Sequence, residues 1–207
     1  MGPSVKTKLL VATTNKGKIR EIREALNLPY LELVTPDDLP SFPRVTEHGA
    51  SFKENAVIKA KTVSRWSGLP AVADDSGLEV DFLGGAPGIR SARYAGEGAT
   101  DSDNNAKLLK ALERVRENNR AARFVCVACY ADPNGHIIVT EGELKGCISE
   151  RPSGKHGFGY DPLFVPRGGR QTVAELGPQA KNRISHRAHA FAAMAKRLDM
   201  LLGPDGG

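Results

Sequence analysis

Apolar residues recur along the chain with the spacing of strands and of helices in turn. Four short apolar runs are typical of strands: residues 8–13, 30–34, 71–73 and 122–131. Apolar residues at helical spacing occupy four other segments: residues 16–26, 51–66, 100–119 and 185–201. Because strands alternate with helices over most of the length, the pattern predicts an α/β fold.

Polar residues indicate where two of the helices begin. Ser51 and Glu54 have the S-x-x-E spacing of a capping box, so a helix is expected to start there. Its apolar stripe would consist of five residues: Phe52, Ala56, Ala60, Val63 and Trp66. Ser185 is the expected cap of the last helix.

The middle of the chain predicts antiparallel pairing. Alternating apolar residues at 78–82 indicate a strand that turns at 84–88 and pairs with 89–94. Residues 122–131 and 136–150 indicate an antiparallel meander around the turn "DPNG". We therefore expect one α/β domain with a mixed sheet over residues 1–207, of which 1–7 form a disordered lead.

The composition is that of an ordinary globular protein. With 207 residues and 40% hydrophobic residues, the chain is long enough to bury a core. It has neither the roughly 20 continuous apolar residues of a membrane span nor the apolar core of a signal peptide, so we expect a cytoplasmic protein without a membrane partner. Cys126 and Cys129 spell C-x-x-C, but residues three apart in a strand face opposite ways, which argues against a shared metal or disulfide.

A net charge of +5 indicates an anionic partner, either a nucleic acid or a phosphorylated small molecule. The segment "ATTNKGK" places a strand end next to a helix start, where backbone N–H groups bind anions. Lys16, Lys18 and Arg20 are cationic where a helix normally prefers acidic residues, and a bound phosphate would reverse that preference. The alternative is a solvated basic helix start capped by Thr14 or Asn15.

Two adjacent aspartates follow the apolar run at 71–73. Asp74 and Asp75 fall at the carboxyl end of a predicted strand, where α/β sheets bind their ligands. Successive strand residues face opposite ways, so one carboxylate could face a ligand while the other anchors the loop. A carboxylate beside phosphate-binding lysines favours Mg²⁺. The alternative is an Asx turn in which Asp75, Ser76 and Gly77 only reverse the chain.

A glycine-rich loop, "SGKHGFGYDP", brings two aromatic residues next to an aspartate. Phe158 or Tyr160 could stack on a base, or Phe158 could simply fill the core. Further along, His186 and Arg187 again put basic residues at a helix start. His186 and His189 lack the other ligands of a zinc site. The chain has neither a Walker A nor a G-x-G-x-x-G pattern.

Five segments together resemble the inosine triphosphatase family of non-canonical purine NTP pyrophosphatases: "TTNKGK", "SFKENAVIKAK", "ADDSGLEVDFLGGAPGIRSARYAG", "GFGYDPLF" and "ISHRAHA". Their order and spacing agree over nearly the whole chain. The resemblance implies a two-lobed domain around a mixed, strongly twisted sheet with flanking helices and a substrate cleft between the lobes. It also implies a homodimeric, Mg²⁺-dependent hydrolase that converts ITP, dITP and XTP to the monophosphate and pyrophosphate and so removes deaminated purines from the nucleotide pool.

The resemblance also implies roles for individual residues. Asp75 matches the catalytic proton acceptor and metal ligand. The matching substrate-binding residues are Thr13, Thr14, Asn15, Lys16, Gly17, Lys18, Lys59, Ser76, Phe158, Gly159, Tyr160, Asp161, Lys181, His186 and Arg187. Thr14 stands where the family commonly has Gly or Ser. Glu47 is our candidate for a second metal ligand, because a capping box already explains Glu54.

These roles predict a mechanism in which a water, oriented by Asp75 or Asp74, attacks the α-phosphorus while lysines receive the charge of the leaving pyrophosphate. His186 and Arg187 would donate to the 6-oxo group, which adenine lacks. Nothing in the sequence indicates how GTP is excluded. Two alternatives stay open: a nucleic-acid-binding protein without enzymatic activity, and a related pyrophosphatase for other modified bases.

Overall fold

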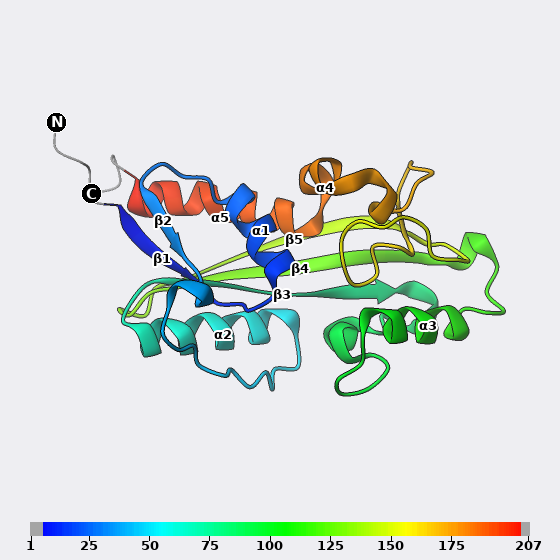
Figure 1. Cartoon of the computed structure of the whole chain (residues 1–207), viewed down its shortest axis with the longest axis horizontal. Coiled ribbons are helices and arrows are strands. Elements are labelled where there is room, and N and C mark those ends of the chain that lie inside the picture. The colour runs from blue at the N-terminus through cyan, green and yellow to red at the C-terminus, as the bar shows by residue number, and fades with distance from the viewer. Residues whose placement is uncertain (1–5, 204–207) are drawn as a thin grey trace. The chain divides into compact units, whose positions relative to one another are not determined.

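The computed structural model describes residues 6–203 of the chain. Its strands and α-helices follow one another as β1 (Thr7–Val11), α1 (Lys16–Ala25), β2 (Leu31–Val34), α2 (Phe52–Ser67), β3 (Ala71–Val80), α3 (Asp101–Ala111), β4 (Ala121–Ala131), β5 (Ile137–Ile148), β6 (Phe164–Pro166), α4 (Val173–Ile184) and α5 (His186–Leu202) (Figure 1). Short 3₁₀ helices are η1 (Pro36–Asp38), η2 (Asp81–Leu83), η3 (Gly88–Arg93) and η4 (Glu117–Asn119). Of the predicted disordered lead, residues 1–5 lie outside the described residues, and Thr7 already belongs to β1.

The strands form one mixed sheet of order β2-β1-β3-β4-β5-β6. β1 pairs in parallel with both β2 and β3, whereas β5 and β6 are antiparallel. This confirms the predicted α/β class with a mixed sheet and flanking helices. In the register of β1 and β3, Val11 lies opposite Val72. The loop after β1 therefore begins beside the strand that carries Asp74 and Asp75.

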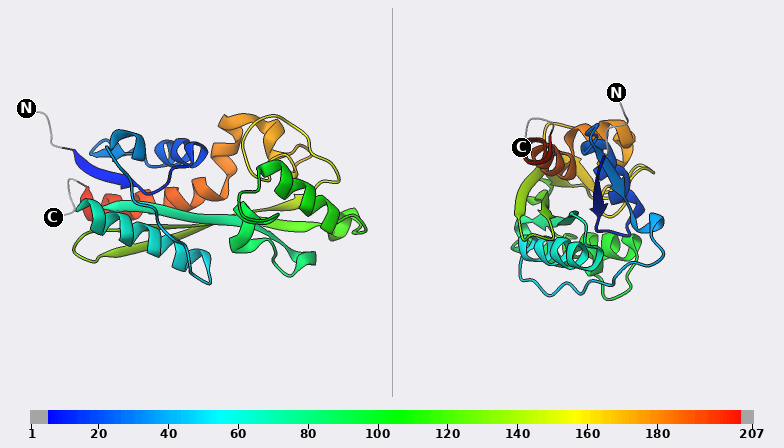
Figure 2. Two further views of the ribbon diagram at one scale, coloured as in Figure 1. Left: turned by 60° about the horizontal axis from the view of Figure 1, so that its bottom comes forward. Right: turned by 90° about the vertical axis from the view of Figure 1, so that its left-hand side faces the viewer.

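The described chain divides into two compact units. Unit 1 contains residues 6–75, 126–142 and 187–203, and unit 2 contains residues 76–125 and 143–186. In unit 1, α1 and α5 cover one face of the sheet and α2 covers the other (Figures 1 and 2). The main core of unit 1 joins the sheet to α1 and α5 through buried residues that include Leu9, Val11, Ile22, Val72, Phe191 and Met194.

Unit 2 has a core of its own. Leu108 of α3 and Leu112, the C-cap residue of that helix, are buried together with Leu78 of β3, Phe164 of β6 and Val173 of α4. Tyr160, from the predicted base-binding loop, belongs to the same cluster. Side chains of that loop are thus anchored by the apolar core of unit 2.

Several predicted elements match the structure in detail. Ser51 caps α2 by accepting from the Glu54 backbone N–H at 3.2 Å. The carboxylate of Glu54 accepts from the Ala50 N–H at 2.7 Å instead of from the cap residue. Four members of the predicted stripe of α2 are buried, whereas Trp66 is 45% exposed. Trp66 packs edge-on against Phe42 instead, with ring centroids 6.1 Å apart.

One open alternative and one local prediction are wrong, and one helix was missed. β3 runs without a break from Ala71 to Val80, so Asp75, Ser76 and Gly77 form strand and no Asx turn. The segment predicted to pair with residues 78–82 is the 3₁₀ helix η3. α4 was not predicted, because Gly177 at a φ of 77° and Pro178 interrupt its helical period.

The cysteines behave as the strand pattern predicts. Cys126 and Cys129 are both buried and free in β4. Cys126 Sγ lies 3.8 Å from an Asp74 carboxylate oxygen, whereas Cys129 Sγ lies 3.4 Å from the carbonyl oxygen of Tyr130. Burial raises the pKa of both thiols, so neither is a reactive thiolate.

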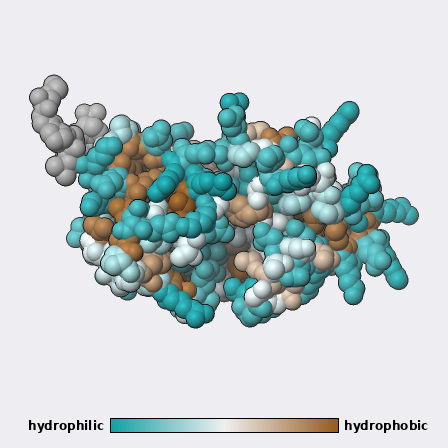
Figure 3. Space-filling view, viewed as in Figure 1, coloured by the Kyte–Doolittle hydropathy of each residue, from teal (hydrophilic) through white to brown (hydrophobic). Residues whose placement is uncertain are grey.

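One face of the molecule can be judged for its polarity. The face drawn in Figure 3 is covered mainly by hydrophilic side chains, with apolar ones in separate patches. Within residues 6–203, none of the helices combines the length and the apolar character that a membrane crossing requires.

Candidate active site

The predicted phosphate-binding segment lies at the start of α1. The Asn15 side chain caps the helix by accepting from the Lys18 N–H at 3.1 Å, and Thr13 Oγ1 accepts from the Asn15 N–H at 3.2 Å. Thr14, Asn15 and Lys16 are exposed, and Gly17 is partly buried. The first-turn N–H groups of α1 and a surface loop therefore meet here, as anion binding requires.

The two lysines of this segment have different surroundings. Lys16 forms an ion pair with Asp37, and both side chains are well exposed. Lys18 reaches back to the sheet, where its Nζ lies 3.0 Å from Asp74 Oδ2 with only 17% of the side chain exposed. Lys18 thus connects the candidate phosphate loop with the strand that carries the paired aspartates.

Asp75 is buried beside an ammonium group and an amide. Its Oδ1 lies 3.2 Å from Lys59 Nζ, and its Oδ2 accepts from Asn55 Nδ2 at 3.1 Å. Lys59 Nζ also lies 3.3 Å from Glu47 Oε2. Lys59 and Asn55 lie one helical turn apart on α2, so that helix presents both side chains to the same carboxylate. The structure therefore brings together Glu47, Lys59 and Asp75, three residues that the sequence had selected.

The pKa of Asp75 is raised, which is the direction that favours a proton acceptor. Burial raises the pKa of Asp75, and the charge of Glu47 adds to the effect against the opposing influence of Lys59 and Lys18. Burial acts to lower the pKa of Lys59, but the carboxylates of Asp75, Asp74 and Glu47 outweigh it and raise that pKa. Lys59 therefore stays charged, while Asp75 holds a proton more readily than an exposed aspartate.

Asp74 points to the opposite face of β3 from Asp75 and contacts a different set of side chains. Its Oδ2 lies 3.0 Å from Lys18 Nζ and 3.2 Å from Arg187 Nε, and its side chain has no exposed surface. The guanidinium of Arg187 also pairs with Glu21 of α1. Burial alone would raise the pKa of Asp74, but the charges of Lys18 and Arg187 hold it well below its usual value. Asp74 is therefore ionised at neutral pH and is poorly suited to take up a proton.

These contacts give Arg187 a role that the sequence did not indicate. Arg187 is 1% exposed and connects α5 with α1 and β3 through Glu21 and Asp74. A guanidinium carries five N–H donors, so these two pairs do not by themselves prevent contact with a purine. The predicted purine contact of Arg187 stays a prediction.

The donor set fits the predicted Mg²⁺. Glu47 and Asp75 both contact one cationic group, the Lys59 ammonium, at 3.3 and 3.2 Å. Mg²⁺ is commonly bound by one or two carboxylates, with phosphate oxygens and waters as its other ligands. Nowhere in residues 6–203 do three or more His, Cys, Asp or Glu side chains gather as a metal site of their own. The two carboxylates would thus hold Mg²⁺ only together with a phosphorylated ligand.

The predicted base-binding residues gather in unit 2. Lys181 Nζ lies 2.5 Å from Asp161 Oδ2 and 4.2 Å from the centroid of the Phe158 ring. Asp161 Oδ2 also accepts from the Phe158 N–H at 3.0 Å. Gly157 has a φ of 83°, and a Cβ there would lie 2.0 Å from Asp161 Oδ2, so only glycine fits. Phe158 is partly buried and is held by this ion pair, whereas Tyr160 is almost fully buried, at 4% exposure.

His186 and Ser76 also belong to unit 2. The His186 ring stacks on Phe124, with centroids 4.7 Å apart and an interplanar angle of 14°, and the residue is 6% exposed. Ser76 is partly buried in β3. The sequence had not indicated the partner side chains Asn55, Glu21 and Phe124. Of these, Asn55 was accessible to sequence reasoning, since it lies four residues before Lys59 on the same predicted helix face.

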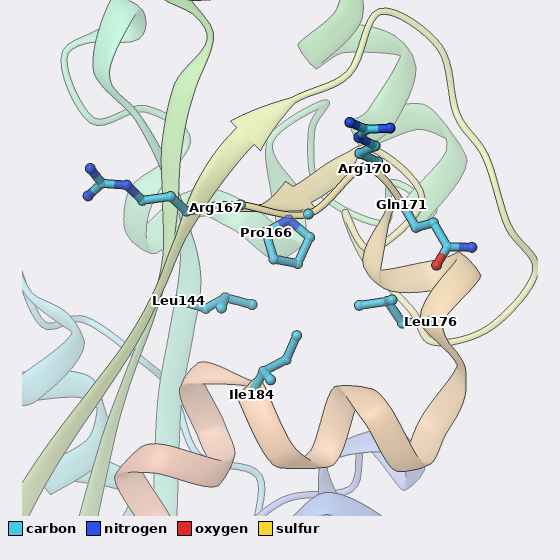
Figure 4. A pocket seen from close by; sticks show the side chains of 9 residues that line it. Leu144, Pro166, Arg167, Arg170, Gln171, Leu176 and Ile184 are labelled. Atoms are coloured by element: carbon cyan, nitrogen blue, oxygen red, sulfur yellow. The ribbon is translucent and has the colours of Figure 1, made fainter.

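Two surface hollows lie apart from these residues. One, of about 380 Å³, is lined in unit 2 by Leu144, Pro166, Leu176 and Ile184, among others (Figure 4). Arg167 points away from this hollow in the figure. The other lies in unit 1, between residues 137–139 and the end of α5. Neither is lined by any of the predicted site residues, so neither is the candidate active site.

Comparison with known proteins gives concordant results. The model of the Ham1 family matches residues 9–197. A dITP/XTP pyrophosphatase of Geobacter sulfurreducens is 50% identical over 193 residues, which cover 93% of this chain and 96% of that protein. One of Methylococcus capsulatus is 48% identical over 202 residues, covering 96% and 100%. The solved structure of a HAM1 protein from Coxiella burnetii has a TM-score of 0.84 at 39% identity, covering 93% of this chain and 98% of that one. A nucleoside-triphosphatase / dITP/XTP pyrophosphatase from Mycobacterium abscessus has a TM-score of 0.74 at 46% identity, covering 91% and 98%.

Proposed function

This chain belongs to the Ham1 family, and on that premise we propose that it hydrolyses dITP, ITP and XTP to the nucleoside monophosphate and pyrophosphate. Its relatives named dITP/XTP pyrophosphatase match it over almost their full length. The observation that carries the proposal is the buried carboxylate of Asp75 beside Lys59 and Glu47. The proposed proton acceptor, Asp75, and the proposed phosphate-binding cation, Lys59, are direct neighbours at 3.2 Å.

The triphosphate is bound by residues of unit 1. Its charge is taken up by Lys16, Lys18 and Lys59 and by the N–H groups at the start of α1. Asp75 accepts the proton of a water that attacks the α-phosphorus, because its raised pKa suits it to hold that proton. Mg²⁺, when bound by Asp75 and Glu47, supplies positive charge to the triphosphate. Pyrophosphate then leaves with its charge compensated by the same lysines.

The residues proposed to bind the base are Phe158 and His186 of unit 2 and Arg187, which begins the last segment of unit 1. Phe158 offers a ring face that Lys181 already orients, and His186 is fixed by stacking on Phe124. A donor at His186 or Arg187 would hydrogen-bond the 6-oxo group of hypoxanthine or xanthine and would face the amino group of adenine without a partner. Sites of this kind can reject a mismatched substrate by about 10⁴-fold. The resemblance further favours a cytoplasmic homodimer that needs no nucleic-acid or membrane partner.

Product analysis tests the proposed function directly. With Mg²⁺ present, ITP, XTP, GTP and ATP are offered separately, and pyrophosphate and orthophosphate are assayed. We expect pyrophosphate and monophosphate from ITP and XTP and little from ATP, because adenine lacks the 6-oxo group that the proposed contacts require. Guanine carries that group, so the release from GTP, which we also expect to be small, measures discrimination against its 2-amino group. Release of orthophosphate would contradict the cleavage position. No release from any nucleotide would favour a binding protein instead.

The pH dependence of kcat/KM tests Asp75 as the proton acceptor. Because burial raises the pKa of Asp75, its carboxylate takes up a proton at a higher pH than an exposed aspartate, whose pKa is about 3.9. Activity that needs the ionised form should therefore fall, as the pH is lowered, at a pH above that value. Titration of the nucleotide alone gives the pKa of its terminal phosphate, so that its ionisation can be distinguished from that of Asp75. An acid limb at or below the ordinary aspartate value would remove Asp75 from this role.

A further inference from the structure

The proposed base-binding segment Phe158–Asp161 is held by contacts between its own residues and by contacts with other parts of unit 2. Lys181 and Asp161 fix Phe158, as described above. The hydroxyl of Tyr160 donates to the carbonyl oxygen of Ser91 at 2.9 Å within the core of unit 2. Gly159, which lies between the two aromatic residues, has neither a side chain nor a place in a strand or helix. Its position depends on what binds its backbone.

Both backbone polar groups of Gly159 are bound by side chains of α3. Asp101 Oδ2 accepts from the Gly159 N–H at 2.6 Å, and Asn105 Nδ2 donates to the Gly159 carbonyl oxygen at 3.0 Å. Asp101 and Asn105 are four residues apart, so they lie on one face of α3. The bond to the carboxylate is of the stronger, charge-assisted kind. Gly159 has a φ of 62°, a left-handed conformation in which the two bonds hold it.

The helix that makes this contact is itself well anchored. Leu108 on its apolar face and its C-cap residue Leu112 are buried in the core of unit 2. The side chain of Asn104 accepts from the Ala95 N–H at 2.8 Å and donates to the carbonyl oxygen of Ala92 at 3.2 Å. α3 therefore gives Asp101 and Asn105 a fixed base from which to hold Gly159.

The Asn105 amide is oriented in a way that only its bond to Gly159 explains. Within residues 6–203, its buried Oδ1 has no hydrogen-bond partner. A buried acceptor without a partner lowers stability, and an apolar side chain would avoid that cost. The hydrogen bond from Nδ2 to the Gly159 carbonyl oxygen is thus the contact that requires an amide side chain at position 105.

We propose that Asp101 and Asn105 are positioning residues for base recognition: they hold Gly159 so that Phe158 and Tyr160 keep the arrangement in which a purine is bound. This inference rests on the proposed function, because it takes Phe158–Asp161 as the base-binding segment. Neither residue belongs to the group of Asp75, Lys59 and Glu47 in unit 1. Their removal should therefore weaken binding of the base and spare binding of the phosphates.

Calorimetric binding of two probes separates these effects. Inosine monophosphate carries the base, and pyrophosphate carries only the phosphate group. For Asp101→Ala and for Asn105→Ala we expect the affinity for inosine monophosphate to fall by about five- to tenfold, because each variant removes one hydrogen bond. Pyrophosphate affinity should stay within about twofold of wild type. In turnover of ITP, KM should rise while kcat changes by less than about twofold.

Two further variants control for a general loss of structure. Asp101→Asn keeps an oxygen that accepts from the Gly159 N–H, so it should recover most of the affinity for inosine monophosphate. Ser102→Ala changes an exposed neighbour in the same turn and should bind both probes as wild type does. Unchanged affinity for inosine monophosphate in both alanine variants would overturn the proposal, as would a parallel loss of pyrophosphate binding.

The same measurements distinguish this proposal from the proposed function. If the wild type binds inosine monophosphate but hydrolyses no nucleoside triphosphate, the enzymatic proposal fails while the affinity ratios still support or overturn the role of Asp101 and Asn105. If the wild type binds no inosine monophosphate, the positioning role is overturned together with base recognition.

Discussion

Replacing Asp75 by asparagine should lower kcat by about 10²–10⁴-fold, the range that a positioned general base contributes. The amide keeps the size of the side chain but cannot take up a proton from water at neutral pH. Substrate binding should persist within a few-fold, because Lys59 retains its contact with Glu47 and the phosphate loop is untouched. Steady-state kinetics with ITP and binding of ITP without turnover measure the two effects separately.

The same variant should not lose stability. Burial raises the pKa of Asp75, which means that the folded protein disfavours the ionised form. A neutral amide removes that cost, and Lys59 keeps Glu47 Oε2 at 3.3 Å as a carboxylate partner for its charge. The melting temperature should therefore stay close to that of wild type, as is common where a catalytic group is held in an unfavourable state. Asp81→Asn, at an exposed aspartate near the end of the same strand, is the matched control and should keep full activity. Unchanged turnover in Asp75→Asn would exclude Asp75 as the proton acceptor.

Local patterns in the sequence were sufficient for most of the fold. The period of apolar residues located β1, α1, α2, β4 and α5, because each of these elements buries one regular face. α4 escaped notice because Gly177 and Pro178 break its period. Its start nevertheless has a recognisable capping pattern, since the carboxylate of Glu175 accepts from the Thr172 N–H at 2.7 Å. A search for caps alone would have found the beginning of this helix.

The two aspartates show what a sequence can and cannot specify about a site. Strand alternation predicted that Asp74 and Asp75 face opposite ways, and their separate partners confirm it. It could not predict which of them is catalytic, because the answer depends on residues brought together by folding. Lys18 and Arg187 neutralise Asp74 from α1 and α5, whereas α2 brings Asn55 and Lys59 to Asp75. The same compensation explains why a polar segment that resembles a turn continues as a buried strand.

Replacing Asp74 by asparagine should produce the opposite result from the change at Asp75: a large loss of stability. Asp74 is the common partner of two cations, Lys18 and Arg187, and Arg187 is almost completely buried. Removing one member of a buried ion pair costs about 3–5 kcal/mol, because the remaining charge loses its compensation. For a chain of this size such a loss lowers the melting temperature by roughly 6–20 °C. Thermal and urea unfolding of Asp74→Asn and Asp75→Asn measure this contrast between neighbouring residues of the same type.

The dependence of this loss on pH provides an internal check. The pKa of Asp74 in the folded protein lies well below its unfolded value, so its contribution to stability is fully present above about pH 5 and is lost as the pH falls through the folded value. The difference in unfolding free energy between wild type and Asp74→Asn should therefore be constant near neutral pH and shrink in acid. A double-mutant cycle with Arg187→Met adds a second check. The loss of unfolding free energy in the double variant should be smaller than the sum of the losses in the two single variants, because the two residues are direct partners. Additive effects, or a melting temperature of Asp74→Asn equal to that of wild type, would show that the buried pair does not anchor β3 to α1 and α5.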